Sequence, residues 1–133
     1  METFFDTSAI VPLLLSEPHS DKAGIAWDEA TVTRLAWRWL KVETESALTR
    51  RRAGAKIWQE WDRIESELNW VELPDSEIES LCRFNRSLGL RGADAGHLFV
   101  ADRLSRTFDR LTLASFDKEM RAGAGDLGLN LAV

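Results

Sequence analysis

Short segments rich in β-branched and aromatic residues alternate along this chain with longer segments of helix-forming residues. The strand-like segments are residues 3–5, 31–33, 70–73, 111–115 and 129–133. Helices are expected between them, at residues 8–15, 21–30, 36–52, 56–68, 75–87, 93–105 and 118–123. Strands separated by helices form crossover connections, which make neighbouring strands parallel and place helices on both faces. The alternation therefore predicts an α/β fold with a mostly parallel central sheet of four to five strands.

Length and composition indicate a single folded domain spanning residues 1–133, because two domains would each have too little core. Apolar residues make up 44% and charged residues 29%, as in ordinary globular proteins. The longest uncharged apolar run, residues 9–15, contains Pro12 and is too short to span a membrane. Glu2 and Asp6 stand where a secretory signal would be basic, and Cys82 is the only cysteine, so we expect a cytoplasmic location.

Charge is unevenly distributed along the chain. There are 22 acidic and 17 basic residues, a net charge of −5, so nucleic acid binding would need local clusters of basic residues. Arg50, Arg51, Arg52 and Lys56 form one such cluster, and arginine suits phosphate because its planar group can donate two parallel hydrogen bonds. The three arginines are therefore candidate RNA contacts. They could also offset the negative end of a helix dipole, and the two roles are compatible.

Two aspartates follow predicted strands. Asp6 comes directly after residues 3–5, and Asp117 comes after residues 111–115 with one phenylalanine between. Open α/β sheets bind ligands at the carboxyl ends of their strands, which is where both side chains are expected. Either residue could instead be the N-cap of the helix behind it.

Two further carboxylates lie on or beside inward faces of predicted helices. Asp94 shares a helical face with Leu98 and Ala101, and Glu43 lies at the edge of an apolar face. A buried carboxylate needs a partner or an opening onto a cleft, because an unpaired one costs several kcal/mol. The alternatives are a helix-dipole interaction for Asp94 and a surface position for Glu43.

Together, four acids from four separate segments indicate a site for a cation. Oxygen ligands without cysteine or paired histidine favour a hard divalent ion, Mg²⁺ or alternatively Mn²⁺. Such an ion can activate water and stabilise in-line displacement at a phosphodiester. The sequence therefore predicts metal-dependent hydrolysis of phosphate esters.

Four motifs resemble, in order and spacing, those of the PIN-domain ribonucleases, and more narrowly the VapC toxins of toxin–antitoxin pairs. They are FFDTSA at residues 4–9, VE at 42–43 with SAL at 46–48, GADAGHL at 92–98 and LASFD at 113–117. The resemblance covers nearly the whole chain. It implies a parallel sheet with an acidic pocket at the carboxyl ends of its strands.

The resemblance also implies roles for individual residues. Asp6 and Asp94 match the main Mg²⁺ ligands, and Glu43 and Asp117 match the acids that complete the pocket. Ser115 occupies the place of a hydroxyl residue beside the last acid, and with Thr7 it is expected to support the site. The family implies cleavage of structured RNA, commonly tRNA or rRNA, by a homodimer. A cognate antitoxin is expected to silence the enzyme by binding it in a heterotetramer or larger complex.

Some residues depart from the family pattern or leave alternatives open. Gly96 replaces a larger aliphatic residue, and His97, one turn after Asp94, is expected to be structural. Three tryptophans have two possible roles: Trp37, Trp58 and Trp61. They could stack on bases, or they could pack in the core, the dimer contact or a groove for an antitoxin helix. An aspartyl phosphatase is disfavoured, because its best-known family needs a second aspartate two residues after the first, and here that position is Ser8. A non-catalytic binding module and a processing nuclease that is not a toxin remain alternatives.

Overall fold

A five-stranded parallel sheet forms the centre of the molecule in the computed structural model, which describes residues 2–133. The strands are β1 (Glu2–Phe5), β2 (Thr33–Trp37), β3 (Asn69–Val71), β4 (Thr112–Ala114) and β5 (Asn130–Leu131). Their spatial order is β3-β2-β1-β4-β5, and every neighbouring pair is parallel. The predicted fold class is confirmed.

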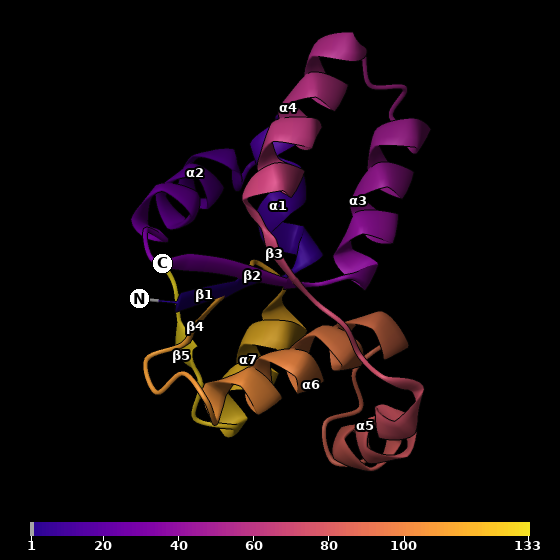
Figure 1. Cartoon of the computed structure of the whole chain (residues 1–133), viewed down its shortest axis with the longest axis vertical. Coiled ribbons are helices and arrows are strands. Elements are labelled where there is room, and N and C mark those ends of the chain that lie inside the picture. The colour runs from indigo at the N-terminus through magenta and orange to yellow at the C-terminus, as the bar shows by residue number, and fades with distance from the viewer. Residues whose placement is uncertain (1) are drawn as a thin grey trace.

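Helices cover both faces of this sheet (Figure 1). On one face lie α1 (Thr7–Leu14), α2 (Ser20–Glu29), α3 (Trp39–Arg50) and α4 (Ala55–Glu67). On the other lie α5 (Ile78–Asn85), α6 (Gly92–Ser105) and α7 (Lys118–Asp126), with a short 3₁₀ turn at Asp75–Glu77 before α5. The two layers enclose separate apolar cores, so the sheet is buried on both sides.

The central strand β1 shows how the sequence produces this arrangement. Successive side chains of a strand point to opposite faces, so Phe4 and Phe5 enter different cores. Both are fully buried, as a strand covered on both faces requires. Asp6 follows at the carboxyl end of β1, where the chain turns into α1. The position of this carboxylate is therefore set by the central strand of the sheet.

One predicted boundary is wrong. Residues 31–33 were expected as a strand and residues 36–52 as a helix, but β2 is Thr33–Trp37 and α3 begins at Trp39. Leu35 and Ala36 are buried between β1 and β3, so sheet pairing outweighs their helix propensity. Trp37 consequently ends a strand instead of lying on a helix.

The tryptophans proposed to stack on bases are mostly part of the core. Trp61 is fully buried, and its Nε1 donates to Glu45 Oε2 at 3.0 Å. Trp58 is partly buried and packs against the same core. The packing interpretation is therefore correct for Trp61 and is favoured for Trp58.

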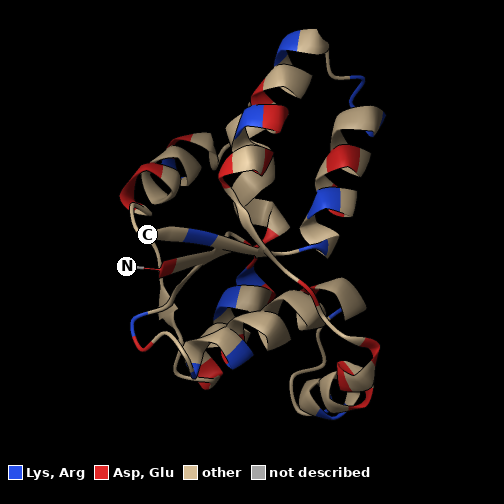
Figure 2. Cartoon of the chain, in the orientation of Figure 1, with Lys and Arg blue, Asp and Glu red and all other residues tan. Residues whose placement is uncertain are grey.

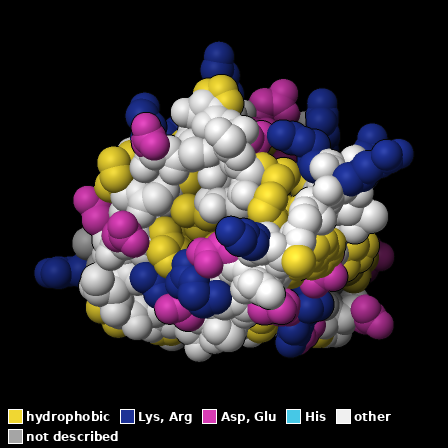
Figure 3. All heavy atoms as spheres, turned by 90° about the horizontal axis from the view of Figure 1, so that it is seen from above, with side chains coloured by type: hydrophobic (Ala, Val, Ile, Leu, Met, Phe, Trp, Pro, Cys, Tyr) yellow, Lys and Arg dark blue, Asp and Glu magenta, His cyan; other side chains and the backbone are white. Residues whose placement is uncertain are grey.

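Basic residues gather where α3 and α4 are joined. Figure 2 shows Lys and Arg at this connection. Arg50 is the last residue of α3, and Arg52 has a positive φ of 51° in the turn that follows. Figure 3 looks onto this end of the molecule and shows Lys and Arg interspersed with Asp and Glu instead of forming one basic face. Within residues 2–133, no helix is long and apolar enough to cross a membrane.

Candidate active site

Asp6 is a buried carboxylate held by two serines. It occupies the N-cap position of α1, yet its side chain makes no capping hydrogen bond. Instead, Ser8 Oγ donates to Asp6 Oδ1 at 2.6 Å, and Ser115 Oγ donates to Oδ2 at 2.5 Å. The residue is only 3% exposed. Its alternative role as an N-cap is therefore wrong, and both carboxyl oxygens are fixed in direction.

Burial raises the pKa of Asp6 above its ordinary value, because a low-dielectric environment disfavours the charged form. The serine hydrogen bonds and the charge of His97 lower this pKa, and the negative charge of Asp94 raises it further. The net shift is upward. Two hydroxyl donors are thus insufficient to compensate the buried charge, and a cation would stabilise it.

Asp117 lies at the end of the neighbouring strand, between β4 and α7. Its Oδ1 accepts from the backbone N–H of Met120 at 2.9 Å, so this aspartate is the N-cap of α7. Its own backbone N–H donates to Ser115 Oγ at 3.2 Å. Ser115 therefore connects the two strand-end aspartates. The capping role leaves Oδ2 of Asp117 without a partner among residues 2–133.

Glu43 projects from the first half of α3 toward α1 and α6. Thr7 Oγ1 donates to Glu43 Oε1 at 2.8 Å, and His97 Nε2 lies 2.6 Å from the same oxygen. Partial burial by itself raises the pKa of Glu43, but these hydrogen bonds and the charge of His97 together lower it below its ordinary value. Glu43 is consequently held as a carboxylate, and Nε2 of His97 carries the hydrogen.

His97 is a component of the site that the sequence reasoning underestimated. It is 1% exposed and packs edge-on against Trp37, with ring centroids 5.0 Å apart and an interplanar angle of 81°. Its Nδ1 has no hydrogen-bond partner within residues 2–133. The available signal was its spacing of three residues from Asp94, which places both on neighbouring parts of one helix surface. Ser8 was also missed, and no sequence pattern pointed to it.

Asp94 interacts electrostatically with each of the other three acids. It lies half-buried in the first turn of α6 and makes no hydrogen bond or ion pair within residues 2–133. Burial raises its pKa most, and the negative charges of Asp117 and Glu43 raise it further, while His97 and Arg91 lower it. The tertiary structure thus brings the other three predicted acids within electrostatic range of Asp94.

Comparisons with known proteins agree with this arrangement. The model of the family described as PIN domain matches residues 3–125. The chain belongs to the PIN-domain family. The match includes every one of the four acids, and the residues beyond its end include the last strand, β5.

Relatives place the chain among the VapC ribonucleases. It is 31% identical over 137 aligned positions to Ribonuclease VapC45 and to Ribonuclease VapC49, from two Mycobacterium tuberculosis strains. In both cases the alignment covers 97% of this chain and 93% of the relative. This PIN domain is therefore a VapC-like member of a ribonuclease toxin family.

Solved structures share the fold at lower identity. VapC20 of Mycobacterium tuberculosis, described as a Sarcin-Ricin loop cleaving toxin, has a TM-score of 0.69 and 17% identity, with 90% of this chain and 93% of that chain covered. PAE2754 from Pyrobaculum aerophilum has a TM-score of 0.62 and 20% identity, covering 92% and 86%. The arrangement of the sheet and helices is thus that of known PIN domains.

PIN nucleases generally use divalent metal ions, and the donor atoms of this site suit one. The four acids supply only carboxylate oxygens, which hard cations prefer, and the raised pKa values of Asp6 and Asp94 indicate uncompensated negative charge. As the side chains stand, no three His, Cys, Asp or Glu groups in residues 2–133 are close enough to hold an ion. The donor chemistry of the four acids nevertheless fits a hard cation.

The arginines predicted to contact RNA are not brought to this pocket. Arg50 follows Glu43 by seven residues on α3, which corresponds to roughly 10 Å along the helix axis. Arg51 and Arg52 lie still further away, in the turn before α4. Contact with the RNA at these residues would have to occur away from the carboxylates.

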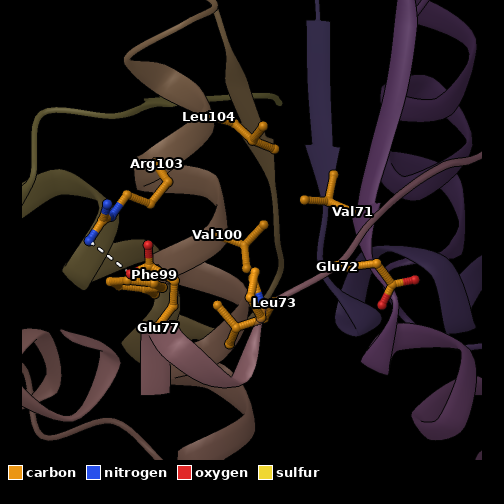
Figure 4. A pocket seen from close by; sticks show the side chains of 9 residues that line it. Val71, Glu72, Leu73, Glu77, Phe99, Val100, Arg103 and Leu104 are labelled. Carbon is orange, nitrogen blue, oxygen red and sulfur yellow. Dashed lines mark hydrogen bonds and ion pairs between the residues drawn. The ribbon is translucent and has the colours of Figure 1, made fainter. Parts of the chain in front are cut away.

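A separate hollow of about 200 Å³ lies beside β3 and α6, away from the four acids (Figure 4). Val71, Leu73, Val100 and Leu104 surround it, and Arg103 pairs with Glu77 at 3.3 Å at its margin. None of the acidic site residues lines it. This hollow is largely apolar, and its charged lining residues are Glu72, Glu77 and Arg103.

Proposed function

We propose that this PIN domain is a Mg²⁺-dependent endoribonuclease toxin that hydrolyses phosphodiester bonds in structured RNA, tRNA or rRNA. The observation that carries the proposal is that Asp6, Glu43 and Asp117 all lie within electrostatic range of Asp94, with raised pKa values for Asp6 and Asp94. The names of the VapC relatives and of the VapC20 structure support the same reaction class. Mn²⁺ is the alternative metal.

Asp6, Asp94 and Asp117 would hold the ion, with Glu43 completing the pocket. A bound divalent cation supplies a water of lowered pKa and positive charge beside the phosphate. Ser8 and Ser115 hold Asp6 in a fixed orientation. These groups would orient a phosphodiester above the carboxyl ends of β1 and β4.

Glu43 has one oxygen available for proton transfer. Both of its hydrogen bonds, from Thr7 and His97, are made to Oε1, and Oε2 has no partner among residues 2–133. The lowered pKa of Glu43 keeps Oε2 unprotonated at neutral pH. Oε2 can therefore accept a proton from the attacking water, while His97 and Thr7 hold the side chain in position.

Partners and assembly are further parts of the proposal. A toxin of this kind would be silenced by a cognate antitoxin that occupies the acidic site, and would act as a homodimer in the cytoplasm, with heterotetramers or larger complexes when the antitoxin is bound. Light scattering on the purified protein, alone and co-expressed with the product of the neighbouring gene, measures both assemblies. A monomer in both samples would contradict this part of the proposal.

The test of the reaction is cleavage of total tRNA and rRNA by the purified protein with Mg²⁺, with Mn²⁺ and with EDTA. Discrete cuts are expected with metal and are expected to disappear with EDTA and in Asp94→Asn. Asp102→Asn is the matched control, because Asp102 lies on the same helix but pairs with Arg106 away from the site. Thermal unfolding of each variant verifies that it is folded.

The outcomes distinguish the proposal from its alternatives. Cuts that persist in EDTA or in Asp94→Asn would contradict the assigned site. RNA binding without cuts would identify a non-catalytic binding module. Cleavage by a protein whose expression leaves growth unaffected would identify a processing nuclease instead of a toxin.

A further inference from the structure

Two hollows on the surface share a pair of stacked rings. The first, of about 330 Å³, adjoins the acidic site and is lined by Thr7, Ser8 and Asp117 together with His19 and Phe116. The second, of about 250 Å³, is also lined by His19 and Phe116. The ring pair therefore separates the acidic site from a neighbouring depression that the proposed reaction does not use.

The ring pair is ordered and tied to the site. The His19 and Phe116 rings are nearly parallel, with centroids 4.9 Å apart and an interplanar angle of 7°. Phe116 packs against the core, and its backbone N–H donates to Ser8 Oγ at 2.8 Å, the hydroxyl that also bonds Asp6. His19 is exposed and lines both hollows, so the open face of its ring, the one not in contact with Phe116, is where an incoming ring would stack. A flat, sequence-tolerant partner for such a face is a nucleobase.

Three basic side chains line the second hollow, together with the His19 and Phe116 rings and Val133. Lys22 from α2 and Lys118 and Arg121 from α7 line it. None of the three forms an ion pair within residues 2–133, although six other basic side chains pair with carboxylates. Arg121 Nη1 donates to the backbone oxygen of Ser115 at 2.9 Å, which anchors the guanidinium beside the acidic site. In a protein of net charge −5, this grouping is suited to an anion.

We propose that an unpaired nucleotide of the RNA substrate, next to the scissile phosphate, binds across these two hollows. Its base stacks on the open face of His19, and its phosphate lies among Lys22, Lys118 and Arg121. A base can stack on a protein ring only when it is not paired within a helix, so the strand at this point is single-stranded. This inference rests on the proposed function, and it adds a binding subsite beside the acidic site.

Binding is tested in the Asp94→Asn background with Mg²⁺ present, using a short fluorescein-labelled single-stranded RNA. His19→Ala is expected to weaken binding by about fivefold to 150-fold, the range that removal of one base stack produces, and His19→Phe is expected to restore it. Thermal unfolding should be similar for both variants, because His19 is exposed. Equal affinity for His19→Ala and the parent would overturn the stacking assignment.

The phosphate interactions are tested with Lys22→Gln/Lys118→Gln. The affinity should fall, and the slope of log Kd against log salt should decrease by about 0.7 for each phosphate that the protein no longer neutralises. Arg86→Gln/Arg110→Gln is the matched control, because it removes the same charge from exposed residues that line neither hollow. An equal effect of both double variants would mean that only net charge matters, and would overturn the subsite.

Cleavage assays separate this inference from the proposed function. In the otherwise unaltered protein, His19→Ala should raise KM with kcat nearly unchanged. If that protein cleaves RNA and the variants bind and cleave like it, the subsite is wrong and the nuclease stands. If it cleaves no RNA but the variants bind RNA more weakly, the subsite stands and the nuclease is wrong.

Discussion

Replacing Gly96 by alanine tests whether the helix that carries Asp94 depends on close contact with Trp37. A Cβ atom added at Gly96 would lie 2.4 Å from Cζ3 and 2.5 Å from Cη2 of the Trp37 ring. Real Cβ atoms essentially never come this close to another heavy atom, so one group must move. The ring cannot move freely, because it packs edge-to-face with His97 and lies near Trp39, with the Trp37 and Trp39 ring centroids 6.3 Å apart. Gly96, the departure from the family pattern, is therefore a packing requirement.

Two opposing contributions decide how much Gly96→Ala changes the free energy of unfolding. Alanine is the better helix former by about 1 kcal/mol, which favours the variant. Overpacking a filled site costs about 1–3 kcal/mol, and the distances here belong to the upper part of that range. We therefore expect Gly96→Ala to lower the free energy of unfolding by about 1–2 kcal/mol. Displacing Trp37 also displaces His97 and thereby Glu43, so RNA cleavage should fall by more than the decrease in stability explains.

Urea denaturation, followed by circular dichroism, measures this change. Gly24→Ala is the matched control: it is also a glycine inside a helix, but nothing lies within 4 Å of its added Cβ, so it should gain up to about 1 kcal/mol. In a Trp37→Leu background the space is free, and Gly96→Ala should no longer destabilise, giving a coupling energy of about 1–3 kcal/mol. The packing requirement is refuted if Gly96→Ala is as stable as the parent, or equally destabilising in both backgrounds.

Three further predictions concern the acidic site. Because the folded protein raises the pKa of Asp94, the stability from its protonated form is complete at low pH and is lost as the pH rises through the folded-state pKa. In EDTA, Asp94→Asn should therefore have a higher Tm than the parent at pH 7 and the same Tm at about pH 3. A Tm difference between the two proteins that does not change with pH would contradict this. Added Mg²⁺ should raise the Tm of the parent in a concentration-dependent manner and leave that of Asp94→Asn nearly unchanged, as differential scanning fluorimetry can measure. Glu43→Gln should lower kcat by about 100-fold or more, and His97→Gln should lower it by about 10-fold to 100-fold. Glu45→Gln, on the same helix as Glu43, should retain activity, because Glu45 bonds Trp61 instead of His97. Full activity in His97→Gln would show that its contact with Glu43 has no catalytic role.

Local pattern was sufficient for the fold class, and it singled out four acids of which three lie within electrostatic range of the fourth, Asp94. Phe4 and Phe5 read as a buried strand because a strand covered on both faces needs apolar residues in succession, and Asp6 follows them directly. Asp94 stood out because a carboxylate on an apolar helix face requires an explanation. Local pattern failed at Leu35 and Ala36, where pairing with β1 and β3 outweighs helix propensity.

The sequence by itself therefore determined the elements, their layering and which carboxylates stand at strand ends or on inward helix faces. Tertiary structure alone decided their partners: Ser115 reaches Asp6 across 109 positions of sequence, and His97 reaches Glu43 across 54. It also decided that His19 stacks on Phe116. The physical reason is that periodicity reports which face of an element is buried, within about one helical turn or one strand. Which side chains meet across that buried face depends on how separate elements pack, and no local pattern encodes it.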